Sequence, residues 1–207
     1  MISSKSHWEQ VYKDKSPLEV SWYQQQPTVS LRLIHNTGLA LDAPIVDVGG
    51  GASSLVDYLC GEGYTRIAVL DISAKALACA RERLGGRAAG VDWYEQDALE
   101  FDPPNRYALW HDRAVFHFLT NRPERRAYVN VLKRTLEPNG HFIIGAFSFT
   151  GPTKCSGLDI VQYDAKKLMS ELGQGFGLVE EVNEIHVTPA GKKQGFAYFR
   201  LVRKPED

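Results

Sequence analysis

The segment Ala-Pro-Ile-Val-Asp-Val-Gly-Gly-Gly, residues 43–51, decides the fold of this chain. A short β-branched strand over 43–48 runs directly into three consecutive glycines. Ser53 or Ser54 then caps a helix whose apolar residues keep helical spacing, namely Leu55, Val56, Leu59 and Cys60. A buried strand that turns through glycines into a helix is typical of the first part of a βαβ unit.

The same alternation recurs along the chain. Short apolar segments predict further strands at 66–70, 91–94, 107–110 and 141–147. Helices are expected between them at 74–84, capped by Ser73, and at 123–136. Alternating strands and helices indicate right-handed βαβ crossovers and a parallel sheet that is covered on both faces.

The C-terminal part has a different pattern. A helix is predicted at 164–172, followed by two alternating segments at 178–187 and 196–202 that are joined by a turn. Two such strands form an antiparallel hairpin at the edge of the sheet. The sequence therefore predicts an α/β fold with a mostly parallel, seven-stranded sheet.

We expect one domain over residues 1–207, because no linker or repeat divides a chain of 207 residues. Residues 1–40 form an N-terminal arm and a helix at 27–36, residues 43–147 form the core, and residues 148–207 add a loop, a helix and the hairpin. The arm is rich in aromatic residues, with Trp8, Tyr12, Trp22 and Tyr23.

Composition excludes several classes of function. The 24 basic and 25 acidic residues give a formal net charge of −1, which argues against non-specific nucleic-acid binding. No apolar run approaches the roughly 20 residues of a membrane span, and the polar start lacks the apolar region of a signal peptide. The three cysteines are an odd number without zinc-site spacing, so we expect reduced thiols and a cytoplasmic protein without a membrane or nucleic-acid partner.

Informative residues fall where the predicted strands end, which is where ligands bind in open α/β sheets. The glycines at 49–51 allow a ligand to approach the backbone closely. Asp71 follows the second strand, 22 residues after Gly49, and a carboxylate there can accept both hydroxyls of a ribose. Asp97 ends the third strand, where it can meet an adenine edge. Together these residues predict a ligand that contains a nucleoside.

Two ligand classes compete for this site. A dinucleotide fingerprint needs a third glycine at position 54, which is Ser54, and a second nucleotide-binding half that the chain after Leu136 does not supply. S-adenosylmethionine needs a turn that cradles a methionyl group rather than a pyrophosphate, so the third glycine is dispensable. The second ligand fits the sequence better.

At this point the chain resembles the class I S-adenosylmethionine-dependent methyltransferases, closely over residues 43–147 and more loosely in the flanks. The segments that carry the resemblance are Val46–Gly51, Leu70–Ser73, Gln96–Ala98, Tyr107–Phe118 and the turn Leu136–Gly140. Asn139 replaces the first glycine of that turn and also tolerates left-handed φ. The resemblance implies a Rossmann-like fold with S-adenosylmethionine as cofactor.

The expected cofactor-binding residues follow from the strand ends and from this resemblance. They are Trp22, Asp47, Gly49, Gly50, Gly51, Asp71, Ile72, Asp97, Ala98 and His111. No metal is expected, because the chain has no cluster of cysteine, histidine and carboxylate residues with ligand spacing. We also expect the aromatic arm to act as a lid whose order depends on the cofactor.

The catalytic candidates follow the fourth strand and are Asp112, Arg113 and His117. Asp112 can align a substrate, Arg113 can hold an anion, and His117 has the pKa range of a general base. The alternatives are a structural Asp112–Arg113 ion pair and a histidine packed in the core. The segment Trp110–Ala114 resembles those of thiopurine-type methyltransferases and of some protein-lysine methyltransferases.

The sequence favours a methyltransferase that acts on a small-molecule nucleophile, as a monomer or homodimer, because no separate macromolecule-binding domain is present. A protein-lysine methyltransferase is the alternative enzyme. A non-catalytic module that keeps the fold, and a nicotinamide-linked oxidoreductase, are further alternatives. The intact glycine turn and Asp71 disfavour a module that has lost its cofactor.

Overall fold

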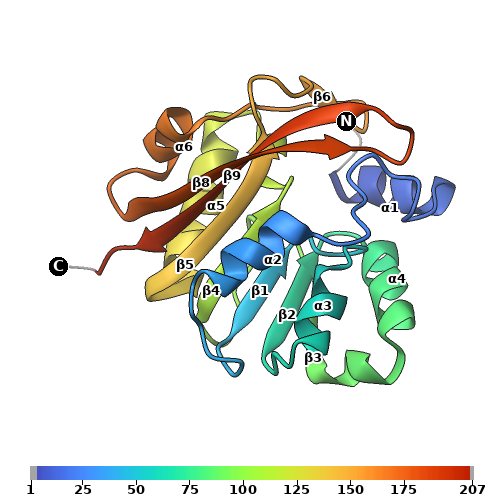
Figure 1. Cartoon of the computed structure of the whole chain (residues 1–207), viewed down its shortest axis with the longest axis horizontal. Helices are drawn as coiled ribbons and strands as arrows, with labels where there is room; N and C mark the ends of the chain where they lie inside the picture. Colours follow the sequence, from blue (N-terminus) through green and yellow to red (C-terminus); the bar gives the residue numbers. More distant parts are fainter. Residues whose placement is uncertain (1–3, 206–207) are drawn as a thin grey trace.

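A computed structural model describes residues 4–205 (Figure 1). Seven strands form one sheet in the order β3-β2-β1-β4-β5-β9-β8, and two short strands, β6 and β7, pair apart from it. The strands are β1 (Ile45–Val48), β2 (Ile67–Asp71), β3 (Val91–Glu95), β4 (Tyr107–Arg113), β5 (Leu136–Phe147), β6 (Lys154–Cys155), β7 (Leu158–Asp159), β8 (Phe176–Val187) and β9 (Lys193–Arg203).

Six α-helices and two 3₁₀-helices connect these strands within the described residues. They are α1 (Ser4–Asp14), α2 (Thr28–His35), α3 (Leu55–Gly61), α4 (Ala74–Leu84), η1 (Gly85–Gly90), η2 (Phe116–Phe118), α5 (Arg122–Thr135) and α6 (Ala165–Leu172). The Ser73 hydroxyl accepts a hydrogen bond from the Ala76 amide and so caps α4, as the sequence predicts.

The predicted fold class is confirmed. Strands β3, β2, β1, β4 and β5 are parallel, and the β8–β9 hairpin adds two antiparallel strands at the β5 edge. The chain passes outward from β1 to β2 and β3, and then returns to β4 on the other side of β1. This reversal opens a crevice at the carboxyl ends of β1 and β4.

The helices form layers on the two faces of the sheet. Helices α2, α3 and α4 pack on one face, and α5 and α6 pack on the other. Successive residues of β1 point to opposite faces of the sheet. Ile45 packs in the core with α2, α3 and α4, and Val46 packs in the core with α5 and α6. Because both faces are covered, all four residues of β1 are buried, and three of them, Ile45, Val46 and Val48, are apolar.

The structure adds elements that the sequence analysis does not predict. The N-terminal arm begins with helix α1, whose Trp8 and Tyr12 are four residues apart and therefore share one face. Strand β4 continues to Arg113 because β1 and β5 pair with it on both sides. The loop after β5 contains the small β6–β7 hairpin. Within residues 4–205 no helix combines the length and apolar character needed to cross a bilayer.

Candidate functional site

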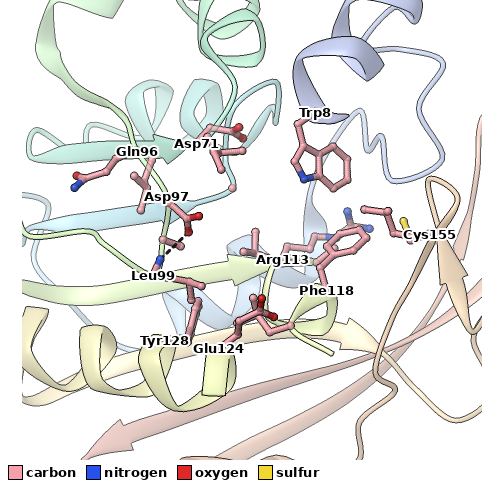
Figure 2. Close-up of a pocket in the computed structure, with 18 of the residues that line it drawn as sticks. Trp8, Asp71, Gln96, Asp97, Leu99, Arg113, Phe118, Glu124, Tyr128 and Cys155 are labelled. Carbon is pink, nitrogen blue, oxygen red and sulfur yellow. Dashed lines mark hydrogen bonds between the residues drawn. The ribbon is translucent and has the colours of Figure 1, made fainter. Parts of the chain in front are cut away.

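A cavity of about 270 Å³ lies at the carboxyl ends of β1, β2 and β4, with α1 and α5 at its sides. Figure 2 shows most of the residues that line it. The lining residues are Trp8, Tyr12, Trp22, Gly49, Leu70, Asp71, Ile72, Gln96, Asp97, Ala98, Leu99, Arg113, Ala114, Val115, Phe118, Leu119, Glu124, Tyr128, Cys155 and Leu158. The structure therefore gathers the predicted strand-end residues Gly49, Asp71, Ile72, Asp97 and Ala98 around one space.

Asp71 ends β2 and is held by two backbone amides. The Gly51 amide donates to its Oδ2 at 3.0 Å, and the Ser73 amide donates to its Oδ1 at 2.8 Å. Each carboxylate oxygen has two acceptor positions, so one position on each stays available for a ligand hydroxyl. Burial raises the pKa of Asp71 to about 6, against the lowering effect of the two amides.

The glycine turn is shaped by contacts that leave no room for side chains. Gly49 has φ of +68°, and a Cβ at this position would overlap the side chain of Val115. A Cβ at Gly51 would overlap the Asp71 carboxylate and the methyl group of Ala76. The Gly49 amide donates to the Leu70 carbonyl at 2.7 Å, which joins the turn to the end of β2. Glycine at 49 and 51 therefore maintains both the turn and the position of Asp71.

Asp97 lies in the turn after β3. Its Oδ1 accepts a hydrogen bond from the Leu99 amide at 2.9 Å, and the neighbouring Gln96 amide donates to the Asp71 carbonyl at 3.1 Å. The turn thus places Ala98 and Leu99 against the cavity at a fixed distance from Asp71. This apolar wall beside a carboxylate can hold a flat ring with polar edges.

Asp47 and His111 form a buried pair below the glycine turn. The Nδ1 of His111 lies 2.7 Å from Oδ1 of Asp47, and its Nε2 lies 2.8 Å from the Ser30 hydroxyl. Both ring nitrogens of His111 are therefore occupied inside the protein, which argues against its predicted direct contact with the cofactor. The Oδ2 of Asp47 has no partner among the described residues, and it borders a second hollow of about 50 Å³ next to Gly50.

Arg113 lies between the two hollows, at the end of β4. Its Nε donates to the Tyr198 hydroxyl at 2.7 Å, its Nη1 donates to the Trp22 carbonyl at 2.8 Å, and its guanidinium lies 4.6 Å from the Phe196 ring centroid. The predicted alternative of an Asp112–Arg113 ion pair is thus wrong. The buried Nη2 has no partner in the described part of the chain, so it can bind an anion.

Asp112, a predicted catalytic residue, is fully buried and shapes the turn after β4. It accepts hydrogen bonds from the amides of Val115 and Phe116 and from the Tyr128 hydroxyl, the last at 2.5 Å. Burial raises its pKa to about 6, although these donors and His111 act in the opposite direction. A carboxylate with these partners, outside the cavity lining, positions the backbone rather than a substrate.

His117, the predicted general base, lies in the core. Its ring is fully buried between Phe118 and Phe147, with centroids at 4.5 and 4.9 Å, and it does not line the cavity. Burial lowers the pKa of His117 to about 3, and the nearby Arg113 adds to this shift. Its neutral ring therefore belongs to the core, which is the alternative that the sequence left open.

Other wall residues come from segments outside the glycine turn and the ends of β2 and β3, including the loop of Cys155, which the sequence places beside the substrate pocket. Leu119, Glu124 and Tyr128 belong to the start of α5 and the segment before it, and Phe118 ends η2. Cys155 of β6 also lines the cavity, where burial raises the pKa of its thiol to about 11 and keeps it neutral. The described residues contain no cluster of histidine, cysteine and carboxylate side chains that fits a metal ion.

The N-terminal arm covers one side of the cavity in two differently attached parts. Trp8 of α1 makes edge contacts with Trp22 and Phe118, at centroid distances of 5.7 and 5.1 Å. The later part is tied by hydrogen bonds, because the Gln24 carbonyl accepts from Ser54 and the Trp22 carbonyl accepts from Arg113. Trp22 therefore lies at the cavity as predicted from the sequence.

We expect α1 to gain order when S-adenosylhomocysteine occupies the cavity, because aromatic contacts at the cavity form much of its attachment. Amide hydrogen exchange over residues 5–14 should slow on adding this ligand, whereas the amides of residues 21–24 should be protected in both states. Equal exchange over residues 5–14 with and without ligand would show that α1 is a fixed part of the core.

Comparison with known proteins identifies the domain that contains this site. Residues 45–140 match the family described as a methyltransferase domain. They include the glycine turn, Asp71, Asp97 and Arg113. This match covers just under half of the chain, and it indicates a methyltransferase domain. The methyl donor of this enzyme class is S-adenosylmethionine, as predicted from the sequence.

Similarity extends beyond this domain to nearly the whole chain. The human protein named EEF1A lysine methyltransferase 2 is 21% identical over 196 residues, which cover 87% of this chain and 77% of that protein. The mouse protein of the same name is 22% identical, over 87% of this chain and 75% of that protein.

Solved structures share the fold of this methyltransferase at low sequence identity. N-methyltransferase NodS from Bradyrhizobium japonicum WM9, in complex with S-adenosylhomocysteine, has a TM-score of 0.70 and 19% identity, with 96% of this chain and 98% of that chain covered. The 1,6-didemethyltoxoflavin-N1-methyltransferase from Burkholderia thailandensis has a TM-score of 0.73 and 17% identity, with 97% and 87% covered.

Proposed function

We propose that this methyltransferase transfers a methyl group from S-adenosylmethionine to the side-chain nitrogen of a lysine in a protein. The supporting observation is the similarity to the human EEF1A lysine methyltransferase 2, which extends over 87% of this chain and so reaches beyond residues 45–140. S-adenosylmethionine supplies a methyl group on a positively charged sulfur that is already activated for displacement.

The residues around the cavity fit the nucleoside part of this cofactor. Asp71 accepts the two ribose hydroxyls on the acceptor positions that the amides of Gly51 and Ser73 leave available. Ile72, Ala98 and Leu99 contact the adenine ring, while Asp97 holds the turn that carries them. These assignments keep the roles expected from the sequence for Asp71, Ile72 and Ala98.

The methionyl part fits the opposite side of the glycine turn. Asp47 Oδ2 and Arg113 Nη2 are two buried atoms without partners in the described chain, and they have opposite charges. Arg113 binds the carboxylate of the methionyl group, and Asp47 binds its amino group, with the backbone of residues 49–51 between them. His111 then acts indirectly, by holding Asp47 in place.

The volume of the cavity limits the shape of the methyl acceptor. Its 270 Å³ lies just below the range of about 300–1,000 Å³ that is usual for sites of drug-sized ligands, so one cofactor fills most of it. The acceptor must then reach the methyl group with a thin, extended end. A lysine side chain meets this requirement, since four methylene groups carry its amine away from the backbone.

A small-molecule acceptor is the second candidate, which the sequence favours because residues 148–207 form a loop, a helix and a hairpin rather than a macromolecule-binding domain. We keep the expectation of a monomer or homodimer without a nucleic-acid or membrane partner. We also propose a cytoplasmic location, since Cys60, Cys79 and Cys155 are free thiols, as is usual in a reducing compartment.

The proposal predicts that label from methyl-tritiated S-adenosylmethionine enters a protein of a cell lysate as methyl-lysine. Acid hydrolysis and amino-acid analysis of the labelled band identify the product. A parallel reaction on the small-molecule fraction of the lysate tests the second candidate. Label in small molecules alone would contradict protein methylation, and the Asp71→Ala variant controls for label from other enzymes.

A further inference from the structure

Glu124 lies in the wall of the cavity, three residues into the start of α5. Its amide donates to Oδ1 of the helix-capping residue Asn121 at 2.9 Å. In a capping box the side chain of this glutamate would turn back to the backbone amide of the cap. Here Figure 2 shows the carboxylate turned into the cavity, on the side away from Asp71.

The other acidic side chains of the cavity are already engaged. Asp71 accepts two backbone amides, and Asp97 accepts the Leu99 amide. The carboxylate of Glu124 makes no hydrogen bond or ion pair with any residue in the range 4–205. The N-terminus of α5 favours a negative charge at this position. Glu124 thus presents an unpaired carboxylate to a partly enclosed space.

Aromatic rings line the same cavity as this carboxylate. Trp8 and Phe118 line the same cavity and meet edge to face, with centroids 5.1 Å apart. Ring faces and carboxylates both attract cations. Arg113 also lines the cavity, but its guanidinium contacts the Tyr198 hydroxyl, the Trp22 carbonyl and the Phe196 ring, and in the proposed function its Nη2 is paired with the methionyl carboxylate.

We propose that Glu124 binds the ammonium group of the methyl acceptor and thereby selects a cationic amine. This inference rests on the proposed function and assigns its acceptor specificity to one residue. Before transfer the bound ammonium releases one proton to water, which frees a lone pair on its nitrogen. This nitrogen then bonds to the methyl carbon while the sulfur–carbon bond breaks, and the sulfur keeps the electron pair. Positive charge therefore moves from sulfur to nitrogen, where the Glu124 carboxylate stabilises it.

The test measures cation binding without turnover. The protein is saturated with S-adenosylhomocysteine, and n-butylammonium, which has the shape of a lysine side chain, is compared with the neutral n-butanol. Binding is followed by the fluorescence of the tryptophans and by ligand-observed NMR. We expect the wild type to prefer the ammonium at least about tenfold, and Glu124→Gln to abolish the preference.

Controls separate binding from folding and from the cofactor. Glu82→Gln, an exposed glutamate on α4, should keep the preference, and Glu124→Asp should restore part of it. The affinity of Glu124→Gln for S-adenosylhomocysteine should change less than about twofold, since Glu124 does not touch the cofactor in this proposal. Thermal melting checks that every variant is folded.

Three results would overturn the inference: an unchanged preference in Glu124→Gln, no preference in the wild type, or a large loss of S-adenosylhomocysteine affinity in Glu124→Gln. The last would place Glu124 in the cofactor site. A failure of the proposed function gives a different result. If the protein does not methylate lysine but still prefers ammonium through Glu124, only the protein substrate is refuted.

Discussion

Replacement of Asp71 by alanine is expected to weaken S-adenosylmethionine binding by about 2–4 kcal/mol, the loss typical of charge-assisted hydrogen bonds. This corresponds to a roughly 30- to 800-fold higher dissociation constant. The physical reason is that the carboxylate, oriented by the amides of Gly51 and Ser73, accepts the two ribose hydroxyls. Isothermal titration calorimetry measures the change, and Asp92→Ala, at an exposed residue of β3, is the matched control.

The same carboxylate predicts how binding depends on pH. Because burial raises the pKa of Asp71 to about 6, the acceptor form is lost as the pH falls through 6. Affinity for S-adenosylmethionine should therefore decrease below this pH, by up to about tenfold per pH unit. Asp71→Asn should bind weakly at every pH and lack this dependence. An unchanged affinity in folded Asp71→Ala protein would refute the ribose assignment.

Valine at Gly49 or Gly51 is expected to abolish cofactor binding. At position 49 the branched side chain meets a φ of +68° and overlaps Val115. At position 51 it displaces the Asp71 carboxylate. Either change moves the turn away from the geometry that holds the ligand, so calorimetry should detect no binding at ligand concentrations that saturate the wild type.

A control for these variants is Gly90→Val, because no atom lies within 4 Å of a Cβ built at Gly90. This variant should bind S-adenosylmethionine like the wild type. Thermal melting of all three variants distinguishes loss of the site from loss of the fold. Normal binding by both folded turn variants would place the cofactor elsewhere.

The fold is largely predictable from the sequence, because apolar segments mark the central strands and because β1 runs into the glycine turn while β2 ends at Asp71. The paired register of β1 with β2 and β4 follows from these positions. Helix α1 is harder to predict, since its sequence is polar and its stability depends on packing. Only the spacing of Trp8 and Tyr12 indicates a helix in the arm.

Site residues that follow the ends of the parallel strands are predictable from the sequence. Site residues that come from other elements are not. Asp71, Ile72 and Ala98 come together because parallel strands end at one edge of the sheet. His117 and Asp112, predicted as catalytic residues, do not line the cavity, since the turn after β4 directs both side chains into the protein. Glu124 is missed because its sequence position has the pattern of a helix cap, and only the structure shows the carboxylate in the cavity.

A crystal structure with S-adenosylhomocysteine tests the central claim, that this chain binds its cofactor at the ends of β1, β2 and β4. We predict both ribose hydroxyls within hydrogen-bond distance of the Asp71 carboxylate and adenine beside Ala98 and Leu99. The methionyl carboxylate should lie at Arg113. A ligand bound outside this cavity, or with its ribose away from Asp71, would contradict the account.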